Sequence, residues 1–188
     1  RFAKWYFDGL MTTQEIFGAY TSGLFVQQDK TKAYSYMSIG SSAGATHQRP
    51  TTVNGAYPFE VGIATVPQLD ASNPKVISQG PSLCILKSGK STDQEILASW
   101  LFVKYLTTNM AFQTEFSSTS GYMPVLKSVT ENEVFANWLA EANGSDKLNA
   151  MAVKVGIEAR DSYFVSPAFN GSTTARNEVG YLLVECIS

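Results

Sequence analysis

Helical periodicity dominates the second half of the chain. Between residues 91 and 106, apolar side chains recur every three or four positions behind a polar start, which predicts a helix with one face, including Trp100, in the core. The same periodicity predicts helices at residues 109–116, 131–142, 146–160 and 173–187, and a weaker one at 13–20. Two pairs have the spacing of a capping box at the first of these helices: Ser91 with Gln94, and Thr92 with Glu95.

Extended patterns occupy the first half instead. Residues 33–39 are rich in aromatic and small polar side chains and end in a run of small residues, which predicts a strand followed by a tight turn. Residues 59–67 form a mostly apolar run that predicts a buried strand, and residues 76–86 predict a second strand with a kink at Gly80. Residues 45–58 are polar and hold two prolines, so we expect a loop there. Strands early and helices late indicate an α/β fold.

Composition narrows the class of protein. The chain has 188 residues, of which 44% are hydrophobic and 16% charged, so it is long and apolar enough to bury a core. With a net charge of −2, the chain lacks the excess of Lys and Arg that is typical of a nucleic-acid-binding protein. No apolar run approaches the length of a membrane span. The sequence opens without a signal peptide and ends inside a helical pattern, so we expect it to be a piece of a longer protein.

Cysteine and histidine are too scarce for the common metal sites. The chain has two cysteines and one histidine, which excludes a site of four such ligands. Cys84 and Cys186 lie in apolar runs, and both are predicted to be small buried side chains. No G-x-G-x-x-G motif is present, so the sequence predicts no metal and no cofactor.

Two short motifs suggest catalysis or phosphate binding. Gly40-Ser41-Ser42-Ala43-Gly44 matches G-x-S-x-G, in which Ser42 would be a nucleophile. The only histidine, His47, lies five residues later, whereas hydrolases with this motif place it last in the chain, so a turn of small residues is the favoured interpretation. Residues 88–91 end in Gly-Lys-Ser like a P-loop, but Cys84 stands where the first glycine is required, which favours a turn before the helix.

An ordered set of segments carries a resemblance to a known family. Its members are a strand ending at Pro67, a glycine segment at 79–85, a lysine turn at 87–90, a helix with Ala-Ser-Trp-Leu-Phe-Val at 98–103, a short helix with Phe-Gln at 112–116, Ser-Gly-Tyr-Met-Pro-Val at 120–125, and Ala175-Arg176. Residues 36–42 match the strand and small-residue turn upstream. The chain therefore resembles the family 1 extracellular solute-binding proteins of ABC importers, which bind sugars and polyols.

The resemblance implies the C-terminal portion of a type II periplasmic-binding-protein-like α/β fold. Residues 1–57 would form a segment of the second lobe, residues 58–114 would supply hinge-crossing strands and a helix to the first lobe, and residues 115–188 would form a helical segment of the second lobe. The family's ligand lies in a cleft between the lobes. The candidate ligand residues are Ser41, Ser42, Gly80, Tyr122 and Arg176.

Each candidate has a physical reason and a structural alternative. Gly80 would let the backbone approach a ligand, or only permit a kink. Tyr122 offers a stacking face and a hydroxyl, or packs in the core. Arg176 would bind a carboxylate, phosphate or hydroxyls, or pair with Glu178. Ser41 and Ser42 would offer hydroxyls to a ligand, or only turn the chain.

The function implied is binding rather than catalysis, without a cofactor. The partners would be a small sugar or polyol and the transmembrane subunits of an ABC permease, with no nucleic acid. The location would be the periplasm or the extracellular face of the membrane, where a lipid anchor outside this chain would hold the protein. Two alternatives remain open at this point: a serine hydrolase that uses Ser42, and a surface protein that binds carbohydrate without transport.

Overall fold

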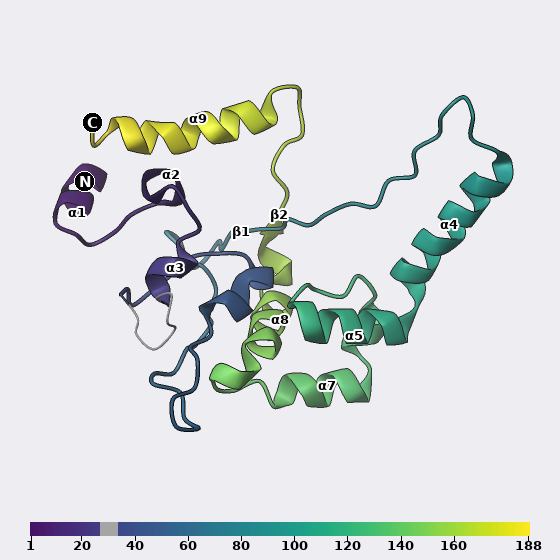
Figure 1. Ribbon diagram of the computed structural model, residues 1–188, viewed down its shortest axis with the longest axis horizontal. Coiled ribbons are helices and arrows are strands. Elements are labelled where there is room, and N and C mark those ends of the chain that lie inside the picture. Colours follow the sequence, from purple (N-terminus) through teal and green to yellow (C-terminus); the bar gives the residue numbers. More distant parts are fainter. Residues whose placement is uncertain (27–33) are drawn as a thin grey trace. The chain divides into compact units, whose positions relative to one another are not determined.

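The computed structural model describes residues 1–26 and 34–188. The chain divides into two compact units (Figure 1). Unit 1 comprises residues 1–39, 50–59 and 165–188, and unit 2 comprises residues 40–49 and 60–164. Ala33, the first residue of one predicted strand, lies outside the described residues.

Unit 1 contains four helices in its described part: α1 (Phe2–Phe7), α2 (Gln14–Phe17), α3 (Ser22–Phe25) and α9 (Ser172–Glu185). Thr13 caps α2 by accepting a hydrogen bond from the Ile16 N–H at 3.4 Å. α2 packs against α9 where Gly180 leaves room, because a Cβ there would lie 2.9 Å from Cγ of Glu15. The helices expected at 13–20 and 173–187 are therefore confirmed, the first in shortened form.

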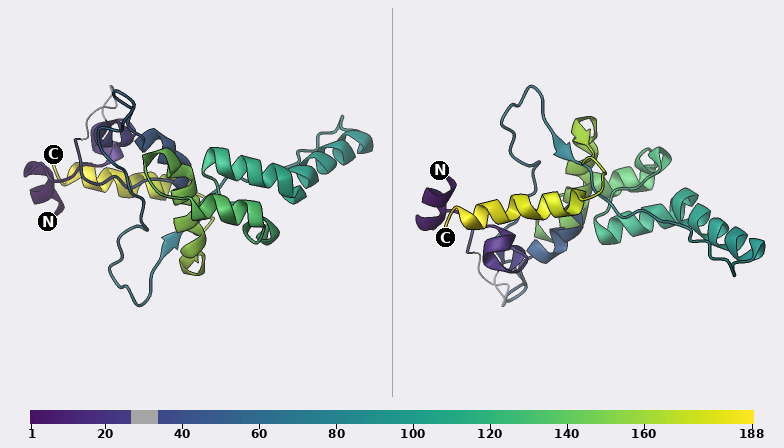
Figure 2. Two further views of the ribbon diagram at one scale, coloured as in Figure 1. Left: turned by 90° about the horizontal axis from the view of Figure 1, so that it is seen from below. Right: turned by 90° about the horizontal axis from the view of Figure 1, so that it is seen from above.

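Unit 2 holds the larger set of elements. They are η1 (Ser42–Gln48), β1 (Val76–Ile77), α4 (Asp93–Thr108), α5 (Met110–Ser120), α6 (Lys127–Thr130), α7 (Glu133–Ala140), η2 (Ser145–Lys147), α8 (Leu148–Glu158), η3 (Arg160–Ser162) and β2 (Tyr163–Phe164). Helix α8 packs against η1, α5 and α7, and the views in Figures 1 and 2 show these helices gathered around it. The helices predicted at 109–116, 131–142 and 146–160 are confirmed with shifted ends.

The core of unit 2 lies between α6, α7 and α8. Val129, Phe135 and Val153 are fully buried there, and Trp138 and Ile157 pack against them with part of their surface exposed. An aromatic ring buried among aliphatic side chains contributes a large apolar area to stability. The residues of α7 and α8 in this cluster lie in segments for which the helical periodicity of the sequence predicted a helix.

Most of the predicted strands are wrong. Among the described residues, the structure pairs Val76 and Ile77 with Tyr163 and Phe164 as two parallel strands, and apart from them it has a single isolated bridge between Val53 and Ala56. Residues 34–39 and 59–67 lie in no strand. A strand requires a neighbour for its backbone hydrogen bonds, and the described residues place none beside these segments. An apolar, β-branched pattern alone cannot supply that neighbour.

The segment that starts at residue 60 is held by side chains instead. Ser145 is buried, and its hydroxyl donates to Oε2 of Glu60 at 2.8 Å and accepts from the Val61 N–H at 2.9 Å. The Ser145 N–H donates to the same Glu60 oxygen at 3.0 Å. Val61 is consequently buried, at 5% exposure, without belonging to a sheet.

Helix α4 confirms one prediction and overturns another. Of the two capping-box pairs, the structure forms the one between Thr92 and Glu95. No residue of α4 is buried, and Trp100 is 52% exposed, so the expectation of a buried face was wrong. Figure 1 shows the reason, since α4 extends away from α5, α7 and α8 and contacts α5 at its end.

The two cysteines are also placed differently from expectation. Cys84 and Cys186 are both exposed and both free. Cys84 lies in an extended segment before α4, and Cys186 follows the last residue of α9. Apolar neighbours in the sequence indicated burial, but Leu83, Ile85 and Leu86 around Cys84 are exposed, and Val184 and Ile187 around Cys186 are only partly buried.

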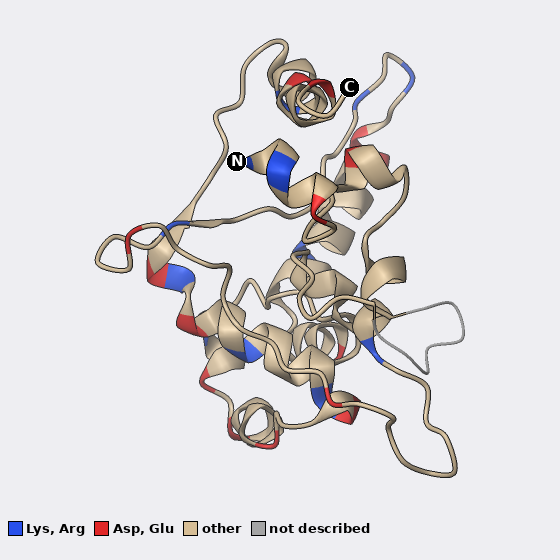
Figure 3. Ribbon diagram, turned by 90° about the vertical axis from the view of Figure 1, so that its left-hand side faces the viewer, with Lys and Arg blue, Asp and Glu red and all other residues tan. Residues whose placement is uncertain are grey.

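The described residues carry charges of both signs at the surface, in line with the small net charge of the sequence. Lys and Arg are interspersed with Asp and Glu along the ribbon (Figure 3), and the ion pairs between them, such as Lys4 with Asp8 at 2.6 Å, lie at the surface. In the described part of the chain, no helix has both the length and the apolar character that crossing a bilayer requires. Those residues also contain no cluster of three or more side chains suited to a metal ion.

Candidate functional site

The turn at the end of α5 brings two distant parts of unit 2 together. Gly121 follows α5 with a φ of +74°, a conformation that glycine adopts without steric cost, and its N–H donates to the Ser117 carbonyl at 3.1 Å. A Cβ at this position would lie 2.9 Å from the carbonyl oxygen of Ser42. Glycine therefore permits the close approach between the end of α5 and the start of η1.

Ser41 and Ser42 form the other side of this approach. Ser41 is the N-cap of η1, and its hydroxyl accepts from the Ala43 N–H at 3.3 Å. Ser42 is the first residue of η1, and its carbonyl faces Gly121. The structure thus brings the predicted residues Ser41 and Ser42 near the turn that carries Tyr122, although about eighty positions separate them in the sequence.

Tyr122 ends a row of aromatic rings that we call the aromatic ladder, defined as Tyr105, Phe112, Phe116 and Tyr122. The Tyr122 ring stacks on Phe116 with centroids 5.9 Å apart and planes at 18°, and Phe116 stacks on Phe112 at 5.7 Å. Tyr105 meets Phe112 at 6.0 Å and 45°. Tyr122 is 37% exposed, so part of its surface is open to a partner while the ladder supports the ring.

Asn149 belongs to the same turn, and the sequence analysis missed it. Its Nδ2 donates to the Thr119 carbonyl at 2.7 Å and more weakly to that of Ser118 at 3.4 Å. Its Oδ1 lies 3.3 Å from where a Cβ of Gly121 would be, is buried, and has no hydrogen-bond partner in the described part of the chain. The signal that could have found it is a lone amide in the largely apolar start of α8.

Gly80 and Arg176 are not brought to this turn by anything the structure describes. Gly80 is exposed, and no atom lies within 4 Å of a Cβ built on it. Arg176 lies exposed on α9 of unit 1. The alternative ion pair between Arg176 and Glu178 does not form among the described residues. Their roles toward a ligand stay predictions.

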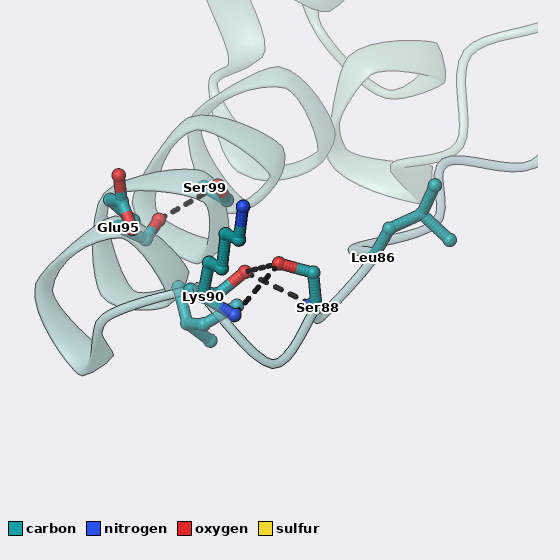
Figure 4. Close-up of a pocket in the computed structure, with 7 residues that line it drawn as sticks. Leu86, Ser88, Lys90, Glu95 and Ser99 are labelled. Carbon is teal, nitrogen blue, oxygen red and sulfur yellow. Dashed lines mark hydrogen bonds between the residues drawn. The ribbon is translucent and has the colours of Figure 1, made fainter.

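A shallow hollow of about 310 Å³ lies at the start of α4 (Figure 4). Its hydroxyl groups are already bonded within the chain: Ser88 and Ser91 bond each other at 3.2 Å, and the Ser99 hydroxyl donates to the Glu95 carbonyl at 2.8 Å. The Gly-Lys-Ser sequence is accordingly a turn before a capped helix, as expected. This hollow uses none of the predicted ligand residues.

The geometry does not assemble the nucleophile elbow at Ser42. That motif requires a strand that turns sharply into a helix, with the serine exposed at the turn. In the described chain no strand precedes Ser42, and the residue opens a 3₁₀ helix instead. The hydrolase interpretation therefore loses the structural context that it needs.

The chain matches the family model described as bacterial extracellular solute-binding protein over residues 5–142, which is more than half of its length. The match includes Ser41, Ser42, Gly80 and Tyr122, and it ends before Arg176 and Asn149. Comparisons with curated proteins and with solved structures returned no match. The chain therefore belongs to the bacterial extracellular solute-binding proteins, whose role is to bind a small molecule in the periplasm or at the outer face of the membrane.

Proposed function

We propose that the chain is part of the substrate-binding component of an ABC importer for a carbohydrate or related polyol. The observation that carries the proposal is the partly exposed Tyr122 ring, which follows the Gly121 turn that the Ser42 backbone carbonyl approaches. Sugars present C–H faces that pack on aromatic rings, and their hydroxyls need hydrogen-bonding groups nearby. The aromatic ladder supports the Tyr122 ring for the first need, and the Ser41 and Ser42 hydroxyls at the start of η1 would serve the second.

The remaining predicted residues extend the proposal. Gly80 would let the backbone approach the bound molecule, and Arg176 would bind its hydroxyls or an anionic group. We also propose the type II arrangement, in which residues 58–114 belong to a first lobe and residues 1–57 and 115–188 to a second. The apolar side chains that α4 leaves exposed support this arrangement, because a helix apolar on several sides normally packs against other elements.

The mechanism proposed is binding with closure of the two lobes. A ligand that contacts both lobes shifts the population toward the closed form, which a permease then recognises. A lipid anchor or the periplasm would keep the protein near that permease. The mechanism requires no covalent step and no cofactor.

The test is a thermal-shift panel on the full protein. The panel contains glucose, maltose, glycerol, sn-glycerol 3-phosphate and glutamate. A compound present at about 100 times its dissociation constant adds roughly 2.7 kcal/mol to the free energy of unfolding, which raises the melting temperature by several degrees. We expect a saturable shift with a sugar or polyol, and no shift with glutamate.

Two variants make the test specific. Tyr122→Ala should strongly reduce the shift, whereas Tyr20→Ala, which removes a tyrosine that is 78% exposed in unit 1, should leave it unchanged. A shift of wild-type size in Tyr122→Ala would contradict the proposed site. Sugar binding that leaves the ATPase activity of the reconstituted permease unstimulated would favour a surface protein that binds carbohydrate without transport.

A further inference from the structure

We infer that Asn149 is a positioning residue for solute binding, because its side chain holds the end of α5 and thereby sets where Tyr122 presents its ring. The inference rests on the proposed function for the role of Tyr122. Asn149 acts on Tyr122 through the backbone of residues 118–121, to which its side chain is bonded or lies close.

The hydrogen bonds of Asn149 fall on groups that a helix leaves unpaired. The last four carbonyls of a helix have no partner within it. Asn149 Nδ2 donates to two of these in α5, the carbonyls of Thr119 at 2.7 Å and Ser118 at 3.4 Å. The Asn149 amide therefore takes the place of a helix cap and ties the last turn of α5 to α8.

The part of α8 that carries Asn149 is well packed. Leu148 and Ala150, the neighbours of Asn149 in the sequence, are 0% and 1% exposed, and Val153 lies in the core of unit 2. Helix α8 also packs against η1, which carries Ser42. The Asn149 side chain thus bonds the end of α5 to α8, the same helix that packs against η1.

Two groups lie close to the residue before Tyr122. At Gly121, a Cβ would lie 2.9 Å from the Ser42 carbonyl oxygen and 3.3 Å from Asn149 Oδ1. Movement of the end of α5 would therefore change the separation between Tyr122 and Ser42. A stacking site depends on such separations, because misplacement of binding groups by about 1 Å costs a large part of their effect.

The loss of Asn149 should affect binding more than folding. Thr119 is exposed, so water can hydrogen-bond its carbonyl once the amide is removed. The core residues Val129, Phe135 and Val153 make none of the hydrogen bonds of Asn149 and remain packed. A purely structural role would instead lower stability and binding together.

The first experiment measures amide hydrogen exchange in the free full protein. In Asn149→Ala, we expect the amides of Gly121 and Tyr122 to exchange roughly tenfold faster than in the wild type, because local opening of the α5 end becomes easier. The amides of α7 should change less than about twofold. Asn137→Ala, an exposed asparagine on α7, is the matched control and should leave residues 117–122 unchanged. Unchanged exchange at Gly121 and Tyr122 in Asn149→Ala would overturn the inference.

The second experiment titrates glucose, maltose and sn-glycerol 3-phosphate and uses a double-mutant cycle. Asn149→Ala should weaken the affinity for whichever of the three the wild type binds by about 5- to 20-fold, while Tyr122→Ala with Asn149→Ala should bind no more weakly than Tyr122→Ala alone. Asn149→Asp keeps the shape but loses the two amide donors, so it should weaken binding at least as much as Asn149→Ala.

The outcomes separate the two claims. Weakened binding in Tyr122→Ala together with unchanged affinity in Asn149→Ala, or additive effects of the two changes, would overturn the role of Asn149 and leave the proposed function standing. Full affinity in Tyr122→Ala would overturn the proposed site. A wild-type protein that binds none of the three compounds would remove the proposed function, and the ligand role of Asn149 would fall with it.

Discussion

Helices α7 and α4 belong to the same unit, and both are capped, but only α7 is packed into the core. Helix α7 has eight residues and buries Phe135 completely. Helix α4 has sixteen residues, many of them apolar, and buries none. The comparison teaches that the signals which start a helix are independent of those which cover it.

Local bonds explain why both helices begin where they do. Asn132 caps α7 by accepting from the Val134 N–H at 3.0 Å, and Thr92 caps α4 by accepting from the Glu95 N–H at 3.2 Å. Such bonds join residues within one turn and need no tertiary structure. Burial depends on α6 and α8, which lie against α7 and not against α4.

The largest effect expected from this comparison comes from matched phenylalanine truncations. Phe135→Ala should lower the free energy of unfolding by about 3–5 kcal/mol, because it leaves a cavity in the core of unit 2. In the 188-residue chain, Phe102→Ala on α4 removes a ring that is 63% exposed and should cost less than about 0.5 kcal/mol. Chemical denaturation of both variants measures the difference. Equal losses would show that α4 is packed in solution.

A smaller effect is expected from matched glycine substitutions. Gly121→Ala should destabilise the protein by about 1–3 kcal/mol, because the residue has positive φ and its new Cβ would meet the Ser42 carbonyl. Gly89→Ala, before α4, meets no atom within 4 Å and should be near neutral. Thermal unfolding compares the two. A neutral Gly121→Ala would contradict the close approach of α5 and η1.

A change of about 1 kcal/mol is expected at the N-terminus of α4. Thr92→Ala removes the side-chain acceptor of the capping box and should weaken the helix by that amount. Thr92→Ser retains the hydroxyl and should preserve most of the stability. Hydrogen exchange in the first turn of α4 measures the effect. Similar exchange in the alanine and serine variants would show that the cap contributes little.

The smallest expected effect is a dependence of the stability of the α4 N-terminus on pH, through Glu95 of the capping box. The N–H of Thr92, and then its hydroxyl, donate to the Glu95 carboxylate and hold the pKa of Glu95 below its usual value. A lowered pKa in the folded state stabilises the helix start above the unfolded pKa of about 4.3, and this contribution is lost as the pH falls through the lowered value.

An NMR titration of the Glu95 carboxyl should therefore give a midpoint below that of a free glutamate. In Thr92→Ala the hydroxyl donor is lost and the backbone donor remains, so the midpoint should move upward without reaching the free value. A midpoint at or above that of free glutamate in the wild type would show that the capping box is open in solution.

The predictable part of the fold consists of elements whose determinants lie within a few residues. The Thr92 capping box and the helices near 110–120, 133–140 and 148–158 follow from caps and periodicity. The strands predicted at 33–39 and 59–67 do not form among the described residues, because a strand exists only beside another strand and the sequence pattern does not state which segment lies there. The prediction that Trp100 is buried was wrong for a related reason: an apolar stripe on a helix does not show which element, if any, packs against it.

The candidate site divides in the same way. Tyr122 follows a glycine in a recognisable Ser-Gly-Tyr motif, so the sequence alone could nominate it. Asn149 had no such motif, and its importance emerges only from the bond to the Thr119 carbonyl, thirty positions away. A residue that acts through a distant backbone group leaves no pattern in its own neighbourhood.

The sequence by itself determined where most longer helices begin, how α4 is capped, and that Ser42 and Tyr122 are candidates for a ligand site. Only the tertiary structure decided that Ser42 approaches Gly121, that Ser145 holds Glu60, and that α8 rather than α4 is packed. The physical reason is range: caps and turns join neighbours along the chain, whereas burial and long-range hydrogen bonds require a partner that folding alone brings near.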